Sequence, residues 1–221
     1  MPPLQRSNPY PWPWDADPDE PLTGDRLALL CVAVQPSFTE TTVGAEAATV
    51  TVGLLARALR QAGAAVVCIT VGARTHPLRP SPLRVEGGEA PDPLIAAYAD
   101  EIVVAPGLDG FFGTSLETIL RSLGRDRLVL CGLGAETAVD STLRSANDRG
   151  FECLTLTDAV APHSPEIAAH THSSVTMSGG IFGAIGTTSD LLGAVGSGPD
   201  SPPTPPASAP LPAVPQEVPV R

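Results

Sequence analysis

The sequence predicts an α/β fold with a doubly wound, mostly parallel sheet. The main observation is the stretch from Arg127 to Asp158, in which an apolar run of strand length, Leu128 to Cys131, passes through Gly132-Leu133-Gly134 into a helix-forming segment. That helix closes at Gly150, and a second strand-like run, Phe151 to Leu156, follows at once. Strand, glycine turn, helix and strand make one βαβ unit, whose crossover rule makes the strands parallel.

The helix in this unit is amphipathic, as a helix lying on one face of a sheet should be. Val139, Leu143 and Ala146 recur at i, i+4 and i+7 and form one apolar stripe. The charged residues lie largely off the stripe: Asp140, Arg144, Asp148 and Arg149.

Further elements follow from apolar runs, helical spacing and breakers along the rest of the chain. Other strands are expected at Arg26 to Val34, Ala64 to Val71 and Asp100 to Ala105. Further helices are expected at Ala45 to Gln61, Leu116 to Leu123 and Pro165 to Met177. In the first of these, Val50, Leu54, Leu55, Ala58 and Leu59 recur at helical spacing, and Gly63 stops the helix.

Proline crowds both ends of the chain and divides it into three parts. Residues 1–24 form an acidic, proline-rich arm carrying Tyr10, Trp12 and Trp14, either docked on the domain or a neighbouring subunit or acting as a solvated linker. Residues 25–196 form the α/β domain. Residues 197–221 are a Pro/Ala/Ser-rich tail, expected to be disordered or polyproline II, with recognition by a proline-binding partner as the alternative.

Charge and hydropathy exclude several classes of partner. The formal net charge is -11, and no basic patch is present to release counterions from nucleic acid or an anionic membrane. No apolar stretch is long enough to span a bilayer, and the N-terminus lacks the pattern of a signal peptide. We therefore expect a cytoplasmic protein with no nucleic-acid or membrane partner.

All 13 basic residues are arginine, so the chain contains no lysine. Schiff-base chemistry, a lysine general base and a P-loop lysine are thereby excluded, because a guanidinium stays protonated. The four cysteines each sit within an apolar strand-like run without metal-ligand spacing, and we interpret them as reduced core residues: Cys31, Cys68, Cys131 and Cys153.

The helix of the βαβ unit also carries a family resemblance. Gly132, Ala138-Val139, Ser141-Thr142, Arg144, Ala146, Asp148 and Gly150 stand at spacings that resemble the signature of the isochorismatase-like cysteine hydrolases, and most closely the amide-cleaving branch that includes biuret hydrolase. The resemblance implies a sheet of six parallel strands with helices on both faces, with Gly179 to Ala184 as the last strand and Ser189 to Val195 as the closing helix. A homo-oligomer or a hetero-oligomer with an active paralogue is implied as well. It also implies that the arm packs on the domain or a neighbour.

The same resemblance implies a catalytic Asp, Lys and Cys, and this chain has alanine at all three positions. Ala138 stands where the family has its cysteine, at a helix start that would lower a thiol pKa. Ala33 replaces the aspartate in a motif whose Gln35 and Phe38 match. Ala105 replaces the lysine before Pro106-Gly107. We therefore predict that Ala33, Ala105 and Ala138 converge at the carboxyl ends of neighbouring strands, with no catalytic residue left.

A small-molecule pocket remains possible at this edge of the sheet. Its candidate lining residues are Phe38, Phe111, Gly134, Ala135 and Thr137. The loop from Gly72 to Pro93 adds His76, Arg74, Arg79 and Arg84 as polar candidates, with solvated side chains as the ordinary alternative. The family's metal-using members need an aspartate and two histidines at set spacing there, and only His76 is present, so we expect neither metal nor cofactor.

Other nucleophiles have little support in the sequence. Cys31 and Cys131 lack a basic neighbour, so we expect their thiols to keep a high pKa. Thr137 and Ser141 flank Ala138 but have no evident base.

Three hypotheses for function stay open. The first is a non-catalytic binding or scaffolding subunit. The second is a hydrolase of altered, triad-independent chemistry that uses positioning and backbone donors at the turn from Gly132 to Ala135. The third is an ordinary cysteine hydrolase whose catalytic residues stand elsewhere.

Overall fold

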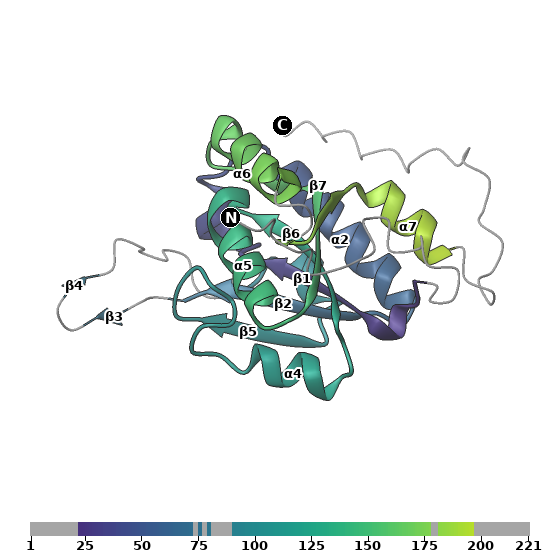
Figure 1. Ribbon diagram of the computed structural model, residues 1–221. Helices are drawn as coiled ribbons and strands as arrows, with labels where there is room; N and C mark the ends of the chain where they lie inside the picture. The colour runs from purple at the N-terminus through teal and green to yellow at the C-terminus, as the bar shows by residue number, and fades with distance from the viewer. Residues whose placement is uncertain (1–21, 73–74, 77–78, 81–89, 178–180, 197–221) are drawn as a thin grey trace, which may run out of the picture.

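A computed structural model describes residues 22–72, 75–76, 79–80, 90–177 and 181–196, and it confirms the α/β fold (Figure 1). Six parallel strands form one sheet in the order β5-β2-β1-β6-β7-β8. Their bounds are β1 Leu27–Val32, β2 Ala65–Val71, β5 Glu101–Ala105, β6 Arg127–Leu133, β7 Glu152–Ala161 and β8 Ala184–Gly186.

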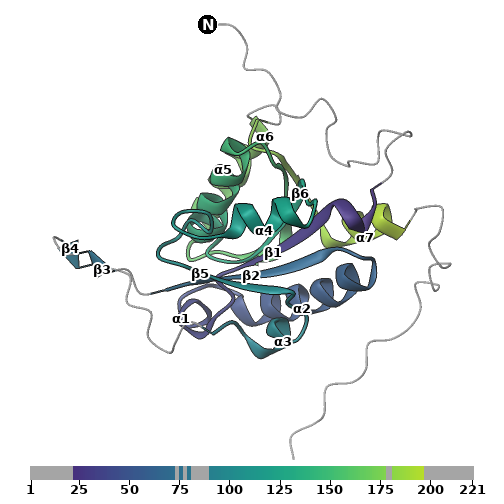
Figure 2. The same ribbon diagram turned by 90° about the horizontal axis from the view of Figure 1, so that it is seen from below.

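Helices cover both faces of the sheet, as the doubly wound pattern requires. Figure 2 shows α1, α2 and α3 on one side and α4, α5 and α6 on the other, while α7 contacts α2 and β7. The helices are η2 Gly24–Arg26, α1 Pro36–Thr39, α2 Ala45–Gln61, α3 Pro93–Ala96, α4 Leu116–Ser122, η3 Ala135–Val139, α5 Asp140–Asp148, α6 Pro165–Met177 and α7 Thr188–Gly196.

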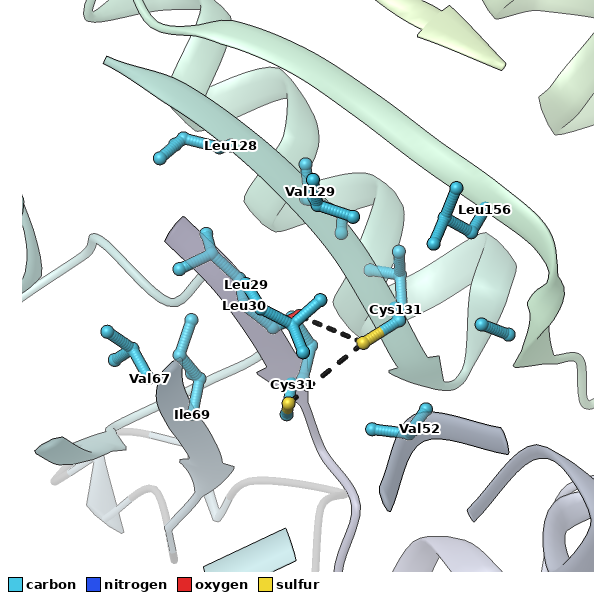
Figure 3. Close-up of a cluster of buried hydrophobic side chains, with 14 of the residues drawn as sticks. Leu29, Leu30, Cys31, Val52, Val67, Ile69, Leu128, Val129, Cys131 and Leu156 are labelled. Carbon is cyan, nitrogen blue, oxygen red and sulfur yellow. Dashed lines mark hydrogen bonds between the residues drawn. The ribbon is translucent and has the colours of Figure 1, made fainter. Parts of the chain in front are cut away.

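The core lies along β1 and β6, the two central strands. Every residue of both strands is buried, and Leu29 of β1 is paired in register with Val129 of β6, as Figure 3 shows. The predicted stripe of the βαβ helix is confirmed, because Val139, Leu143 and Ala146 are all buried. Burial of this apolar surface is the main term that fixes the sheet between its helix layers.

Helix α2 has the predicted bounds, but part of its expected stripe faces outward. Leu55 and Leu59 are buried against the sheet, whereas Val50 and Leu54 are exposed. The buried side also carries the small residues Ala48 and Ala56.

Three further differences concern local structure. The last strand was expected at Gly179 to Ala184, of which residues 179–180 lie outside the described part of the chain. Within that part β8 begins at Ala184, directly after Gly183, which has φ +92° and lies close to the Cys153 carbonyl. The helix after Gly134 begins with five residues of π-helix. The expected loop from Gly72 to Pro93 contains a short antiparallel pair, β3 (Thr75–His76) and β4 (Arg79–Pro80).

The ends of the chain lie mostly beyond what the structure describes. The expectations for the arm at residues 1–24 fall outside the described residues up to position 21, and those for the tail at residues 197–221 fall outside them entirely. Leu22 is already part of the core, with 1% of its surface exposed. Within the described ranges, we find no helix with the length and apolar character needed to cross a bilayer.

Candidate functional site

The three alanines of interest all lie at the carboxyl edge of the sheet. Ala33 directly follows β1, Ala105 is the last residue of β5, and Ala138 lies in the π-helical turn after β6. Strands β1 and β6 are adjacent, while β2 separates β1 from β5, so the three strands are not all immediate neighbours. Each alanine is 0% exposed.

Ala33 has an unusual backbone conformation. Its φ of 55° makes it the only non-glycine residue with positive φ among the described residues. The conformation is fixed on both sides, because the Ala33 N–H donates to the Ile69 carbonyl at 2.7 Å and its carbonyl accepts from the Gln35 N–H at 2.9 Å. Left-handed backbone costs a residue with a Cβ about 1 kcal/mol or more, and it is adopted more readily by Gly, Asn and Asp than by Ala.

Gln35 holds the ends of β1 and β2 together. Its side chain is fully buried and is bonded twice to Val71, with Nε2 donating to the carbonyl at 3.0 Å and Oε1 accepting from the N–H at 2.6 Å. Both polar atoms of the amide are thereby satisfied, so its role here is structural.

The two glycines at the end of β6, Gly132 within the strand and Gly134 after it, leave no room for side chains. A Cβ on Gly132, whose φ is +128°, would lie 2.0 Å from the Val32 carbonyl oxygen. Gly134 has φ +72°, and its N–H donates to the Ala161 carbonyl at 2.8 Å. Its own carbonyl accepts from the N–H groups of Thr137 and Val139, at 3.0 and 3.1 Å. The Gly134 N–H is therefore already engaged and is not an open donor.

Three side chains approach Gly134 closely. A Cβ placed on this glycine would lie 2.5 Å from Thr137 Oγ1, 3.2 Å from Phe38 Cε1 and 3.3 Å from His163 Nε2. The structure thus brings together Phe38, Gly134 and Thr137 of the predicted pocket, and Ala135 adjoins them in the chain. His163 was not predicted, because its partners lie far away in sequence.

The imidazole of His163 is fixed in place from several directions. Its Nδ1 lies 3.0 Å from the Thr41 carbonyl oxygen, and its ring centroid lies 5.8 Å from that of Phe38 with an interplanar angle of 42°. Hydrogen bonds also fix the residues on either side of His163. The Pro162 carbonyl accepts from the Val43 N–H at 2.7 Å, and the Ser164 N–H donates to Glu136 Oε1 at 2.7 Å.

Phe111 does not join this group. Its ring lies 5.8 Å from that of Phe151, and the Arg149 guanidinium lies 5.0 Å above it. Phe111 lines a cleft of about 680 Å³ between α4 and the end of α5, together with Thr114, Glu117, Thr118, Arg121, Ser122 and Arg149.

The cysteines behave as predicted for reduced core residues. All four are free and buried. The hydrogen bond with Cys131 raises the pKa of the Cys31 thiol, and the hydrogen bond with Cys31 raises that of Cys68. Burial raises the pKa of Cys153. Figure 3 shows Cys31 and Cys131 side by side, with sulfur atoms 4.0 Å apart. A thiol that stays protonated is a poor nucleophile.

The remaining polar candidates give no metal centre within the described part of the chain. No group of three His, Cys, Asp or Glu side chains there has the arrangement of a metal site. Arg74 and Arg84 lie outside the described residues, and only the backbone of His76 and Arg79 is described.

Comparisons with known proteins identify relatives of this fold. A family model described as the isochorismatase domain matches residues 27–190. The uncharacterized isochorismatase family protein YecD of Escherichia coli O157:H7 is 34% identical over 125 residues, covering 52% of this chain and 66% of that protein. The ureidoacrylate amidohydrolase RutB of Enterobacter sp. (strain 638) is 30% identical over 125 residues, covering 55% of this chain and 54% of RutB.

Solved structures show the same fold. An isochorismatase family protein from Burkholderia thailandensis superposes with a TM-score of 0.69 at 21% identity, covering 79% of this chain and 98% of that one. The nicotinamidase PncA from Bacillus subtilis superposes with a TM-score of 0.62 at 23% identity, covering 72% and 98%.

Proposed function

The chain belongs to the isochorismatase family, and we propose that it is a catalytically degenerate member that acts as a small-molecule-binding or scaffolding subunit. One observation carries the proposal: alanine stands at positions 33, 105 and 138, where the family resemblance implies Asp, Lys and Cys, and the 221 residues contain no lysine at all. An alanine side chain supplies no proton, charge or nucleophile.

The backbone at Ala33 supports this interpretation. Its positive φ lowers the stability of the fold when the residue is alanine, and it would lower it less if the residue were aspartate or glycine. A conformation that suits an aspartate is thus occupied by a residue that gains nothing from it. This is the pattern expected where the scaffold of a catalytic site is kept and its side chain is absent.

The alternative function is a hydrolase acting on a small amide or related metabolite by triad-independent chemistry. It requires open backbone donors at the turn from Gly132 to Ala135. The Gly134 N–H donates to the Ala161 carbonyl, so it is not available to stabilise an oxyanion. The buried thiols of Cys31 and Cys68 have raised pKa values, so they are poorly suited to act as nucleophiles.

Ammonia release from small amides tests the proposal directly. The purified chain, freed of copurifying hydrolases, should release none above background from biuret, nicotinamide or ureidoacrylate. The loss of one member of a cooperative catalytic unit typically costs several orders of magnitude in rate, and here three are missing. The variant Ala33→Asp/Ala105→Lys/Ala138→Cys should gain turnover, provided that circular dichroism shows it folded.

Matched controls separate the possible failures. The variant Ala33→Asn/Ala105→Met/Ala138→Ser has similar volumes without the reactive groups, so it should stay inactive. Turnover by the parent chain that survives replacement of all four cysteines would favour the alternative function. Turnover abolished by Cys31→Ala or Cys131→Ala would instead identify a working thiol.

Scaffolding further implies a partner, either a second copy or an active paralogue. Size-exclusion chromatography with and without residues 1–20 tests whether the arm holds one. The deletion stops short of Leu22, which begins the buried core, so the α/β domain should stay folded. An assembly unchanged by the deletion would mean that the arm is only a linker.

A further inference from the structure

The outer face of helix α2 carries a stripe that the described part of the chain leaves exposed. Four residues recur there at spacings of three and four, so they lie on one side of the helix: Ala47, Val50, Leu54 and Arg57. All four are exposed, and the exposed fractions of the two larger apolar side chains are 52% for Val50 and 57% for Leu54. Apolar residues at this spacing are the pattern by which one helix packs against another.

Helix α3 widens this apolar surface. The two helices are in contact and lie on the same side of the sheet (Figure 2). Leu94 of α3 lies beside Gly53 of α2, since a Cβ on that glycine would be 3.7 Å from Leu94 Cβ, and Leu94 is itself 56% exposed. Three large apolar side chains are thus exposed on two neighbouring helices, which is more than singly scattered surface residues explain.

Two charged residues flank the apolar pair on α2. Glu46 lies in the first turn of the helix, and Arg57 lies beyond Leu54 toward its end. Both are exposed, and neither has an ion pair or a side-chain hydrogen bond among the described residues. They are about 16 Å apart along the helix axis, which is farther than the two side chains can bridge. Each charge is therefore free to pair with a group outside its own helix.

A second copy of α2, running antiparallel to the first, matches both the apolar and the charged residues. When Val50 faces the partner's Leu54, two-fold symmetry also places Leu54 against the partner's Val50. The Glu46–Arg57 pair and the Val50–Leu54 pair are centred within one residue of each other along the helix. In this register Glu46 therefore lies next to the partner's Arg57, and the same contact recurs at the other end. The face is complementary to itself in both shape of pattern and charge.

We propose that the outer face of α2, together with Leu94 of α3, is the interface of a two-fold homodimer. In this dimer α2 packs antiparallel on the same helix of a second copy, and Glu46 pairs with the partner's Arg57. The interface is small, so the association is weak and dilute protein is monomeric. The inference rests on the scaffolding part of the proposed function, for which it names a partner and a surface.

Sedimentation equilibrium of the full chain, from about 1 to about 200 µM, measures the association. Salt at about 0.15 M screens the mutual repulsion of two chains that each carry a formal charge of -11. The parent chain should pass from monomer toward dimer over this range. Leu54→Asp places a charge in the apolar centre and should weaken the association at least about tenfold. The matched control is Ile167→Asp on α6, where the parent side chain is 55% exposed, and it should leave the association unchanged.

Charge reversal tests the antiparallel register. Glu46→Arg and Arg57→Glu each place like charges opposite one another at both ends of the interface, so each variant alone should associate about tenfold more weakly. An equimolar mixture of the two variants should associate about as strongly as the parent chain, because each chain then meets opposite charges on the other. Circular dichroism should show both variants folded.

A thiol probe tests whether another part of the chain covers the face. Leu54→Cys in dilute protein should react with a maleimide at the rate of an exposed thiol, and the four native cysteines are buried. Slow reaction of the new thiol would mean that a segment of the same chain, residues 1–21 or 197–221, occupies the surface, and the proposal would be wrong.

Three association results would also overturn the proposal. A chain that stays monomeric over the whole concentration range forms no such dimer. A dimer that Leu54→Asp does not weaken uses another surface. A mixture of Glu46→Arg and Arg57→Glu that associates no better than its components excludes the antiparallel register. None of these measurements depends on ammonia release, so a failure here and a failure of the proposed function are distinguishable.

Discussion

The cleft between α4 and α5 and the sheet edge at Gly134 use polar side chains in opposite ways. In the cleft, Glu117 pairs with both Arg121 and Arg149, at 3.6 and 3.2 Å. The two guanidinium groups also lie over rings, Arg121 at 4.1 Å from Phe151 and Arg149 at 5.0 Å from Phe111. These charges satisfy one another, which is the pattern of a stabilising network.

At the sheet edge the constraint comes from the backbone instead. Gly132 and Gly134 adopt positive φ and pass close to Val32 and Phe38, and the Gly134 N–H and carbonyl are both bonded within the fold. Side-chain polar groups contribute less there: Glu136 Oε2 in η3 has no hydrogen-bond partner among the described residues. The cleft is thus held by side-chain charges that pair with one another, and the sheet edge by backbone conformation and backbone hydrogen bonds.

The largest expected effect is that of Gly132→Ala at the sheet edge. Its Cβ would lie 2.0 Å from the Val32 carbonyl oxygen at a φ of +128°, so we expect a loss of more than about 4 kcal/mol in the free energy of unfolding, or no folded protein. Urea denaturation measures the loss. The matched control is Gly124→Ala at the end of α4, where φ is +67° and nothing lies within 4 Å of the new Cβ.

The control variant isolates the steric clash. Gly124→Ala should cost only the left-handed backbone term of about 1–2 kcal/mol. Equal losses at the two positions would mean that the sheet edge yields as easily as the outer loop, and the contrast between the two regions would fail.

The second effect is alkaline destabilisation through the buried thiols of the sheet. Cys31, Cys68 and Cys153 have folded-state pKa values raised above the ordinary 9.0. Above that pH the unfolded chain loses thiol protons that the folded chain keeps, so the unfolded state binds fewer protons and stability falls as pH rises. The stabilising contribution is fully present below pH 9.0.

Each thiol should contribute a slope of up to about 1.4 kcal/mol per pH unit above the ordinary thiol value. Urea denaturation from about pH 8 to about pH 10 measures the slope. Cys153→Ala lowers stability at every pH by leaving a cavity. It should also reduce the slope of stability against pH by the contribution of one thiol. An unchanged slope would show that Cys153 does not titrate differently in the two states.

A smaller effect is expected from breaking the charge network of the cleft with Arg149→Met. The Arg149–Glu117 pair is only partly buried, with side chains 31% and 46% exposed, so solvent screening limits the loss to about 1 kcal/mol. The loss should shrink further at high salt. Arg57→Met on α2 is the control, because Arg57 is exposed and has no ion pair among the described residues.

The two arginines should therefore differ. Arg57→Met should change the free energy of unfolding by less than about 0.5 kcal/mol. If Arg149→Met were equally silent, the charge pairs of the cleft would not stabilise the fold, and the contrast with the sheet edge would fail.

The sequence predicted the regular elements well where a single periodic pattern decides them. Helices α2 and α6 have the predicted bounds, and the six strands lie in one parallel sheet. Predictions failed where a distant contact decides the outcome. The start of β8 depends on Gly183 meeting Cys153, and the outward side of α2 at Val50 and Leu54 depends on how closely the helix lies to the sheet.

The candidate site shows the same division. Phe38, Gly134 and Thr137 were predicted from short motifs and do lie together, whereas Phe111 lies in the separate cleft. His163 could not be predicted, since its anchoring oxygen on Thr41 is 122 residues away. Nor does a side-chain pattern signal a π-helical turn, because its hydrogen bonds are set by the carbonyl of Gly134.

The smallest expected effect has the opposite sign and concerns Ala33. A φ of 55° destabilises the folded chain by about 1 kcal/mol or more when the residue is alanine, and glycine avoids this cost. Glycine's greater conformational freedom in the unfolded chain offsets part of that advantage. Ala33→Gly should therefore raise the free energy of unfolding by about 0.5 kcal/mol. Ala58→Gly, in the ordinary backbone of α2, should lower it by about 1 kcal/mol. Urea denaturation of the two variants and of the parent chain measures both effects. If both variants were less stable than the parent, the backbone at Ala33 would carry no strain. Its geometry would then not favour the aspartate that the family resemblance implies.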